Sequence, residues 1–190
     1  MNPNPDPNID GKPWRQTTAL ILGGARSGKS RHGERLCLDL AAAGSVPPVY
    51  IATAQAFDDE MRARIDDHRS RRGPEWATID APLDLPAAVA AQSNAVVLVD
   101  CLTLWLTNVI LADRPVDTAR ADLLSTLATA AENGTSVILV ANEVGLGLVP
   151  ETPLGRRFRD EAGILNQAVA SVADTVTFIA AGLPLSLKSA

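Results

Sequence analysis

The chain has 190 residues, of which 46% are apolar and 21% charged, and its formal net charge is −5. These values describe one globular domain with a full core, and they argue against nucleic acid or an anionic membrane surface as a partner. No apolar run has the length of a membrane span, so we expect a cytoplasmic protein with no membrane segment. Cys37 and Cys101 have no metal-like spacing and read as small core residues in a reducing compartment.

The first 16 residues differ from the rest. The stretch MNPNPDPNIDGKPW contains four prolines and few apolar residues, and it lacks the apolar segment of a signal peptide. We therefore expect a flexible tail over residues 1–16 and a single folded domain over residues 17–190.

Beyond the tail, short apolar runs alternate with segments of helical period. The pattern predicts strands at 17–22, within 46–54, and at 95–100, 136–144 and 175–181. It predicts helices at 29–43, 57–72, 101–112, 116–133 and 154–173. Strands that alternate with helices indicate an α/β fold, with a mostly parallel sheet and helices on both of its faces. We find no internal repeat and no second domain boundary.

A phosphate-binding motif follows the first predicted strand. GGARSGKS, residues 23–30, matches the pattern G-x-x-x-x-G-K-[ST] in full and opens a predicted helix, which favours a P-loop over a chance match. In such a loop the backbone N–H groups surround phosphate oxygens, the lysine reaches the outer phosphates, and the last hydroxyl holds Mg²⁺. The predicted nucleotide-binding residues are Gly23, Gly24, Ala25, Arg26, Ser27, Gly28, Lys29 and Ser30. The fold is therefore predicted to be of the P-loop NTPase type.

A P-loop also needs an acidic partner for the metal, and Asp100 comes directly after the apolar run VVLV. We predict that Asp100 and Ser30 hold Mg²⁺. The alternative is that Asp100 caps the helix that follows, since aspartate is favoured at that position.

The segment ARIDDHRSRRG, residues 63–73, surrounds His68 with arginines. On a helix, Met61, Ile65 and His68 share one face, so His68 continues an apolar stripe. The plain interpretation is a histidine at the edge of the core. In a nucleotide-binding domain the arginines also create an anion site, and a neutral imidazole beside bound phosphate is a competent nucleophile. His32, in the helix after the P-loop, is assigned no chemistry.

Five stretches together resemble a known family. They are GGARSGKS, YIATAQAFDDEMRARIDDHRSRRGPEW, VDCLTLWLTN, NEVGLGLVPETPLGRRFRDEAGILNQ and ADTVTFIAAGLP. In this order they resemble the bifunctional adenosylcobinamide kinase/adenosylcobinamide-phosphate guanylyltransferases of cobalamin biosynthesis, over residues 17 to 184. The resemblance implies phosphorylation of adenosylcobinamide from ATP or GTP, followed by transfer of GMP from GTP to adenosylcobinamide phosphate.

The resemblance also implies site residues and an assembly. His68 corresponds to the histidine that carries GMP as a phosphoramidate, and Asp67 stands where some relatives have a second histidine. The family is a homotrimer with the nucleotide near a subunit boundary. Beyond the P-loop, the implied nucleotide contacts are Ala52, Thr53, Ala54, Arg69, Ser70, Arg71, Arg72, Asp80 and Asp100, and Asp80 stands where relatives often have glutamate.

Two other functions also account for the P-loop. A single-function kinase of another small alcohol would use the P-loop and Asp100 and give His68 no role. A non-catalytic nucleotide-binding regulator would bind nucleotide without turnover. NEVGLGLVP and residues 156–160 are candidates for the corrinoid pocket or a subunit interface, or form an ordinary loop and helix start.

Overall fold

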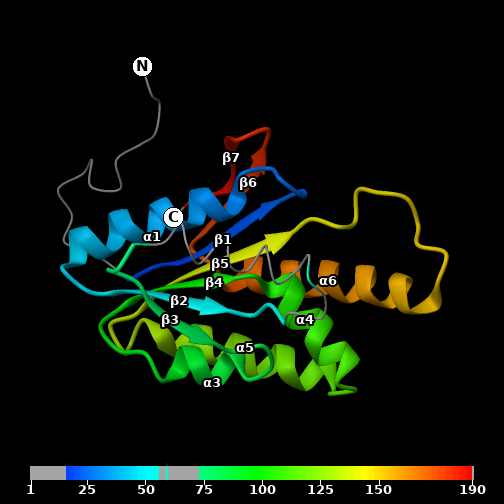
Figure 1. Ribbon diagram of the computed structural model, residues 1–190, viewed down its shortest axis with the longest axis horizontal. Helices are drawn as coiled ribbons and strands as arrows, with labels where there is room; N and C mark the ends of the chain where they lie inside the picture. Colours follow the sequence, from blue (N-terminus) through cyan, green and yellow to red (C-terminus); the bar gives the residue numbers. More distant parts are fainter. Residues whose placement is uncertain (1–15, 56–58, 60–72, 190) are drawn as a thin grey trace.

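The computed structural model describes residues 16–55, 59 and 73–189, and Figure 1 shows their arrangement. In this part of the chain, seven strands form one sheet with helices packed against it. The strands are β1 (Thr18–Gly23), β2 (Pro48–Ala52), β3 (Ala77–Asp80), β4 (Val96–Asp100), β5 (Ser136–Asn142), β6 (Thr175–Ala180) and β7 (Leu183–Lys188). The helices are α1 (Lys29–Gly44), α3 (Leu85–Ala90), α4 (Leu102–Leu111), α5 (Val116–Ala130) and α6 (Pro153–Val172).

The order of the strands across the sheet is β3-β2-β4-β5-β1-β6-β7. Neighbouring strands are parallel except β6 and β7, which form an antiparallel hairpin. β1, which leads into the predicted P-loop, lies between β5 and β6, and β5 separates it from β4. The carboxyl ends of the parallel strands therefore meet at one edge, where α/β proteins bind ligands.

Helices cover both faces of the sheet. α1 lies on one face, and α3, α4, α5 and α6 lie on the other (Figure 1). β4 shows why this layering follows from the sequence. Val96 and Leu98 belong to the apolar cluster on the α1 side, whereas Val97 and Val99 belong to the cluster on the opposite side. Because successive side chains of a strand point to opposite faces, a continuously apolar strand is buried only between two helix layers.

The predicted elements are confirmed wherever the structure describes them. The predicted helix 57–72 and nearly all of the predicted tail, residues 1–16, lie outside the described residues. Three elements were missed: β3, α3 and β7. β3 has four residues and α3 has six, so each is too short for its periodicity to stand out in the sequence. The strand 175–181, taken as the last, is followed by the turn Ala181-Gly182, with φ of 51° and 80°, and by β7. Positive φ at both central residues is the geometry that tight hairpins prefer.

Both cysteines are buried and free, as the sequence predicts. Across the described ranges, no helix is long and apolar enough to cross a membrane.

Candidate functional site

The loop between β1 and α1 is closely packed at its first glycine. A Cβ atom on Gly23 would lie 2.5 Å from Ser27 Oγ and 2.7 Å from the backbone oxygen of Ile179. Gly28, directly before α1, has a φ of 97°, which a residue with a side chain rarely adopts. Arg26 also has positive φ, at 56°. Gly23 and Gly28 are therefore explained by the shape of the loop itself.

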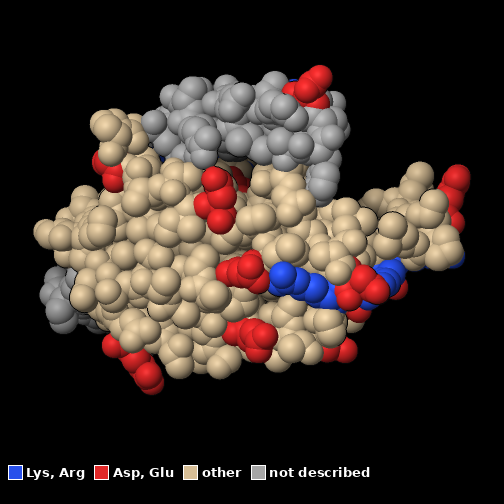
Figure 2. All heavy atoms as spheres, turned by 60° about the horizontal axis from the view of Figure 1, so that its bottom comes forward, with Lys and Arg blue, Asp and Glu red and all other residues tan. Residues whose placement is uncertain are grey.

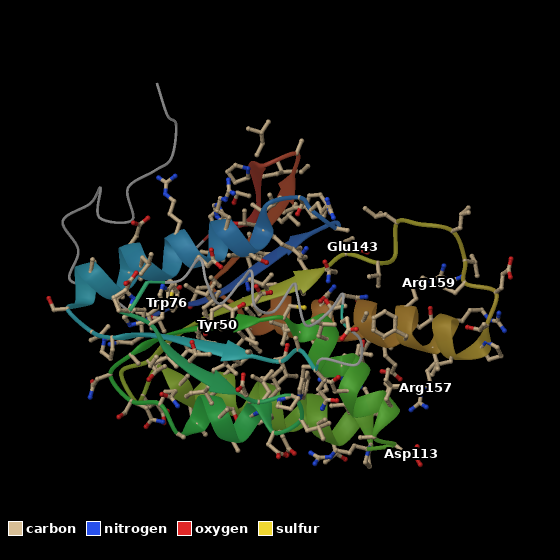
Figure 3. All side chains as sticks on the ribbon, viewed as in Figure 1. Tyr50, Trp76, Asp113, Glu143, Arg157 and Arg159 are labelled. Atoms are coloured by element: carbon tan, nitrogen blue, oxygen red, sulfur yellow. The ribbon has the colours of Figure 1, made fainter. Side chains whose placement is uncertain are left out.

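The ends of two neighbouring strands hold this loop in place. The Glu143 backbone N–H, just after β5, donates to the Gly23 oxygen at 3.1 Å. The Gly182 N–H, in the β6–β7 turn, donates to the Ser27 oxygen at 2.9 Å. Figure 3 shows Glu143 beside the tip of β1. Because the loop is fixed by backbone contacts on both sides, its N–H groups are pre-arranged for an anion.

Lys29 begins α1 and turns back over the loop. Its side chain is buried, with a relative exposure of 8%, and its Nζ donates to the Gly24 oxygen at 3.1 Å. The ammonium group therefore lies where the loop, the start of α1 and their partial positive charges meet. Ala25 and Arg26 are exposed at the tip, and Ser30 is half-buried in the first turn of α1. This arrangement is suited to binding a polyphosphate.

Asp100 ends β4 at the same edge of the sheet. The Tyr50 hydroxyl donates to Asp100 Oδ2 at 3.0 Å, and the Tyr50 ring packs edge-on against Trp76 with 6.0 Å between ring centroids (Figure 3). Cys101, not Asp100, occupies the position before α4, and no side-chain cap forms there. The alternative role of Asp100 as a helix cap is therefore not what the structure has.

The Ser30 hydroxyl and the Asp100 carboxylate are the predicted protein ligands of Mg²⁺. In residues 16–55, 59 and 73–189, no three His, Cys, Asp or Glu side chains gather as a metal cluster. The Ser30 hydroxyl and the Asp100 carboxylate are oxygen ligands of the kind that Mg²⁺ prefers, and this ion takes its other ligands from phosphates and water. These residues fit a Mg²⁺ ion that also binds phosphate oxygens, and they do not fit a site in which the protein supplies all the ligands.

Three predicted residues lie in one row across the sheet. Ala52 of β2 is in register with Asp80 on one side and Asp100 on the other. Strand spacing sets about 10 Å between the two aspartates. The same spacing separates β4 from β1, because only β5 lies between them. Asp80 is therefore at the far end of the edge on which the P-loop and Asp100 lie.

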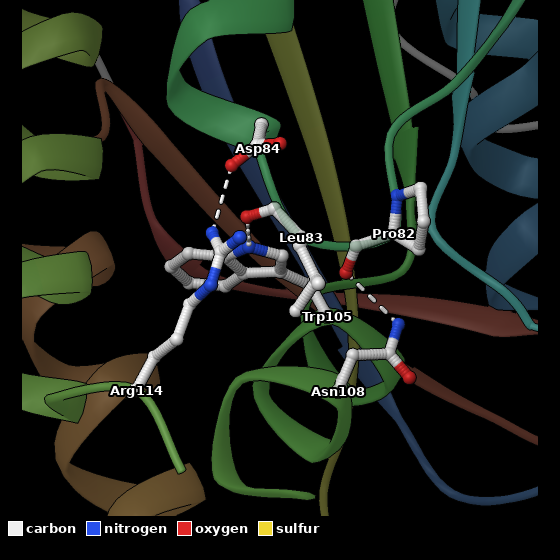
Figure 4. Close-up of polar contacts among 6 residues, drawn as sticks. All are labelled: Pro82, Leu83, Asp84, Trp105, Asn108 and Arg114. Carbon is white, nitrogen blue, oxygen red and sulfur yellow. Dashed lines mark hydrogen bonds and ion pairs between the residues drawn. The ribbon is translucent and has the colours of Figure 1, made fainter. Parts of the chain in front are cut away.

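Thr53 fixes the backbone beside Asp100. Its hydroxyl donates to the Cys101 oxygen at 2.8 Å and accepts from the Cys101 N–H at 2.8 Å, and the residue has no exposed surface. Asn108 of α4 donates to the Thr53 oxygen at 2.8 Å and to the Pro82 oxygen at 2.9 Å (Figure 4). The Thr53 side chain thus positions Asp100, while Ala52 and Ala54 are only half-buried.

Burial shifts the pKa of two groups near the site. Burial, and then the negative charge of Asp100, raise the pKa of the Cys101 thiol to about 11, so that it stays protonated. Burial, and then the charge of Arg35, lower the pKa of His32 below its usual value. The protonated Cys101 thiol is a poor nucleophile, whereas the lowered pKa keeps His32 in its neutral form at neutral pH.

The segment between β5 and α6 projects from the body of the protein (Figures 1 and 2). Leu146 and Leu148 on it are 83% and 96% exposed. Thr152 caps α6 by accepting from the Gly155 N–H at 3.1 Å, and Arg156 donates to the oxygens of Pro150 and Glu151 at 3.1 Å and 2.7 Å. Of the candidate residues 156–160, Arg156 therefore holds the projecting segment.

A cavity of about 270 Å³ lies among α3, α4 and α5, on the sheet face opposite α1. Apolar side chains line most of it, and the ion pair between Arg114 and Asp84, at 2.7 Å, stands at its rim (Figure 4). Trp105 forms part of the wall and donates to the Leu83 oxygen at 3.0 Å. No residue of the P-loop contributes to it.

Comparison with known proteins decides the family. The model of the family "Cobinamide kinase / cobinamide phosphate guanyltransferase" matches residues 19–187. The chain belongs to this family. It is 52% identical over 173 residues to the bifunctional adenosylcobalamin biosynthesis protein CobP of Pseudomonas aeruginosa, covering 89% of this chain and 96% of that protein. It is 39% identical over 183 residues to the bifunctional adenosylcobalamin biosynthesis protein CobU of Escherichia coli, covering 89% and 98%.

The fold agrees with that of a solved structure. The flagellar accessory protein FlaH from Methanocaldococcus jannaschii aligns with a TM-score of 0.54 over 97% of this chain and 83% of that chain, at 15% identity. At this identity the likeness concerns the fold alone.

Five of the predicted site residues lie outside the described residues. They are His68, Arg69, Ser70, Arg71 and Arg72. Their roles remain predictions that rest on the sequence and on the resemblance to the family.

Two residues that hold the site were missed by sequence reasoning. Tyr50 reads as an ordinary strand residue and Asn108 as an ordinary polar residue of a helix. Their contacts with Asp100 and Thr53 join elements about 50 residues apart. Motif spacing and hydrophobic periodicity describe neighbours along the chain, so they do not reveal such contacts.

Proposed function

We propose that the protein phosphorylates the hydroxyl group of adenosylcobinamide, with ATP or GTP as donor, and then transfers GMP from GTP to the product, giving adenosylcobinamide-GDP. The observation that carries the proposal is the complete P-loop, which is held between β5 and β6 with Asp100 at the same edge of the sheet. Membership of the cobinamide kinase family supplies the corrinoid substrate.

The P-loop binds the triphosphate in both reactions. Its N–H groups and the start of α1 face the phosphate oxygens, and Lys29 neutralises charge on the outer phosphates. Ser30 and Asp100 would hold Mg²⁺, which would supply further neutralisation of the phosphates. Tyr50 orients the Asp100 carboxylate through its 3.0 Å hydrogen bond. Ala52, Ala54 and Asp80, at the same edge, contact the rest of the nucleotide.

GMP transfer proceeds through His68. A neutral imidazole nitrogen attacks the α-phosphorus of GTP, the bond to the bridging oxygen breaks, and pyrophosphate leaves with that electron pair. A phosphate oxygen of adenosylcobinamide phosphate then attacks the same phosphorus and releases the imidazole. Arg69, Arg71 and Arg72 bind the phosphates, and Ser70 contacts the nucleotide beside them. This step is supported by the sequence and by the resemblance to the family.

We also propose that the protein forms a homotrimer and is located in the cytoplasm. The homotrimer follows from the resemblance to the family, and the exposed apolar side chains of the projecting segment support a subunit contact there. The buried free thiols of Cys37 and Cys101 support a reducing, cytoplasmic compartment. Residues 1–16 form a tail without catalytic residues, and residues 17–190 form the catalytic domain.

Labelled GTP distinguishes this proposal from its alternatives. GTP carrying a label at the α-phosphate should label the protein itself, and the adduct should be labile to acid and stable to alkali, as a phosphoramidate is. GTP labelled at the γ-phosphate should label adenosylcobinamide instead. Transfer from the γ-phosphate without a labelled protein indicates a single-function kinase, and binding without any transfer indicates a regulator.

A further inference from the structure

Asn142 ends β5 beside the P-loop. The sequence interpretation includes it only as the first residue of NEVGLGLVP, a candidate for the corrinoid pocket, a subunit interface or an ordinary loop. It is in register with Gly23, the residue at which the P-loop leaves β1. Two residues earlier, Val140 is in register with Asp100 on the opposite neighbour, β4. Asn142 therefore stands between the two strands that carry the P-loop and Asp100, with its Cα about 5 Å from that of Gly23.

The pattern of burial along β5 gives the direction of the Asn142 side chain. Ile138 and Val140 belong to the apolar cluster on the α1 side of the sheet, whereas Leu139 and Ala141 belong to the cluster on the other side. Side chains alternate along a strand, so the Asn142 amide is on the α1 side. Asp100 is on this side for the same reason, because Leu98 precedes it there. Both polar groups thus face the helix that begins with Lys29.

Two buried polar side chains hold the backbone of Asn142. Thr103 of α4 accepts from its N–H at 2.7 Å, and Asn166 of α6 donates to its oxygen at 3.5 Å. Thr103 and Asn166 are each 8% exposed. In the described part of the chain, the half-buried side-chain amide of Asn142 itself makes no hydrogen bond, although an amide offers two donors and an acceptor. The backbone of Asn142 is therefore held by side chains of α4 and α6, and its side-chain amide is available to bind another molecule.

We propose that Asn142 is a catalytic residue whose amide N–H donates to an oxygen of the terminal phosphate of the bound nucleotide. The inference rests on the proposed nucleotide-binding function of the P-loop. In the kinase step, the substrate hydroxyl oxygen bonds to the γ-phosphorus, and the bond from that phosphorus to the β–γ bridging oxygen breaks. The nucleoside diphosphate leaves with that electron pair, and the hydroxyl proton passes to solvent. A donor at the γ-phosphate stabilises the group in transfer.

In the guanylyl step the reaction is at the α-phosphorus instead. The γ-phosphate is then a remote part of the leaving group, and little charge develops on it. Loss of Asn142 should therefore slow the kinase step more than the guanylyl step, whereas loss of Lys29 should slow both.

Binding gives a test that does not depend on turnover. The α,β-methylene analogues of GTP and GDP lack the bond that GMP transfer breaks, and their affinities are measured by titration calorimetry. In Asn142→Ala, the preference for the triphosphate over the diphosphate should fall by about tenfold or more, because a hydrogen bond to a charged group is lost. Asn142→Asp, which keeps the size of the side chain, should lower it further by repulsion. Asn133→Ala, an exposed asparagine at the opposite end of β5, is the matched control and should keep the wild-type preference.

Rates give the second test. In Asn142→Ala the kinase kcat should fall on the order of 10²-fold, with less than a tenfold loss in the guanylyl step. An unchanged triphosphate preference, or equal losses in both steps, would overturn the inference. If the Ala variant melts early, Asn142→Asp gives the same comparison at constant volume. Turnover retained by Lys29→Ala in both steps would instead overturn the proposed function.

Discussion

Replacement of Thr53 by valine should destabilise the protein at the buried backbone of Cys101. Valine has the shape of threonine without a hydroxyl, so the N–H and the oxygen of Cys101 would each lose a partner 2.8 Å away. The site has no exposed surface, and water cannot replace the hydroxyl without local opening. The Cys101 oxygen still accepts from the Trp105 N–H at 3.1 Å, so the variant leaves only the Cys101 N–H unsatisfied. An unsatisfied buried group costs about 1–3 kcal/mol, and the free energy of unfolding should fall by this amount, out of the roughly 5–15 kcal/mol that stabilises a typical domain.

The measurement is urea unfolding followed by circular dichroism, at one fixed protein concentration because oligomers gain stability with concentration. Thr53→Ser is the matched control. It keeps the hydroxyl and loses one methyl group, which should cost about 1 kcal/mol. Asp100 directly precedes Cys101, so the valine variant should also need more Mg²⁺ for turnover. Equal stability of the valine and serine variants would refute the role given to the hydroxyl.

Four further predictions follow from the site. Lys29→Ala should lower the rates of both half-reactions on the order of 10²–10³-fold in steady-state assays, and a wild-type rate in either would contradict a shared P-loop. Asp100→Asn should raise the Mg²⁺ concentration needed for half-maximal rate without changing the melting temperature; an unchanged metal dependence would argue against the metal role. His68→Ala should abolish labelling of the protein by α-labelled GTP and retain kinase activity, and a labelled variant would exclude His68 as the nucleophile. Burial and Arg35 lower the pKa of His32 in the folded state, so the unfolded chain binds more protons near pH 6, and stability is lost as the pH falls below about 6.5. His32→Gln should therefore show a smaller loss of melting temperature between pH 7.5 and 5.5, and an equal loss would dismiss this contribution.

The P-loop and the central strands could be predicted from the sequence because their signals are local. The run VVLVD needs two covering layers to bury it, and GGARSGKS carries the glycines that its own turn requires. β3 and β7 could not be predicted in this way. β3, with the sequence ATID, is too short for its alternation to stand out from chance. β7, with the sequence LPLSLK, also alternates, but its proline argues against a strand, and all of its residues are exposed.

The charged residues of the site could be predicted from the sequence, but the residues that position them could not. Lys29 and Asp100 follow from the motif and from the strand before the aspartate. Thr53 is expected to contact the nucleotide by family resemblance, and its hydroxyl also bonds to the backbone of Cys101, a contact that the sequence does not reveal. Asn142 was assigned, with the rest of NEVGLGLVP, to a candidate corrinoid pocket or subunit interface. Its place beside the P-loop could not be predicted, because register across β1, β4 and β5 is a property of the assembled sheet.

The position of β1 in the sheet has a consequence for the order in which the protein folds during synthesis. β1 pairs only with β5 and β6, and its first pair, Thr18 with Val137, spans 119 residues. A nascent chain therefore contains the whole P-loop motif long before either partner strand of β1 has left the ribosome. Closing such a long loop costs entropy that local contacts do not offset. Gly182, which fixes the loop through Ser27, is made after both β5 and β6, so the phosphate site is completed only once these strands have been synthesised.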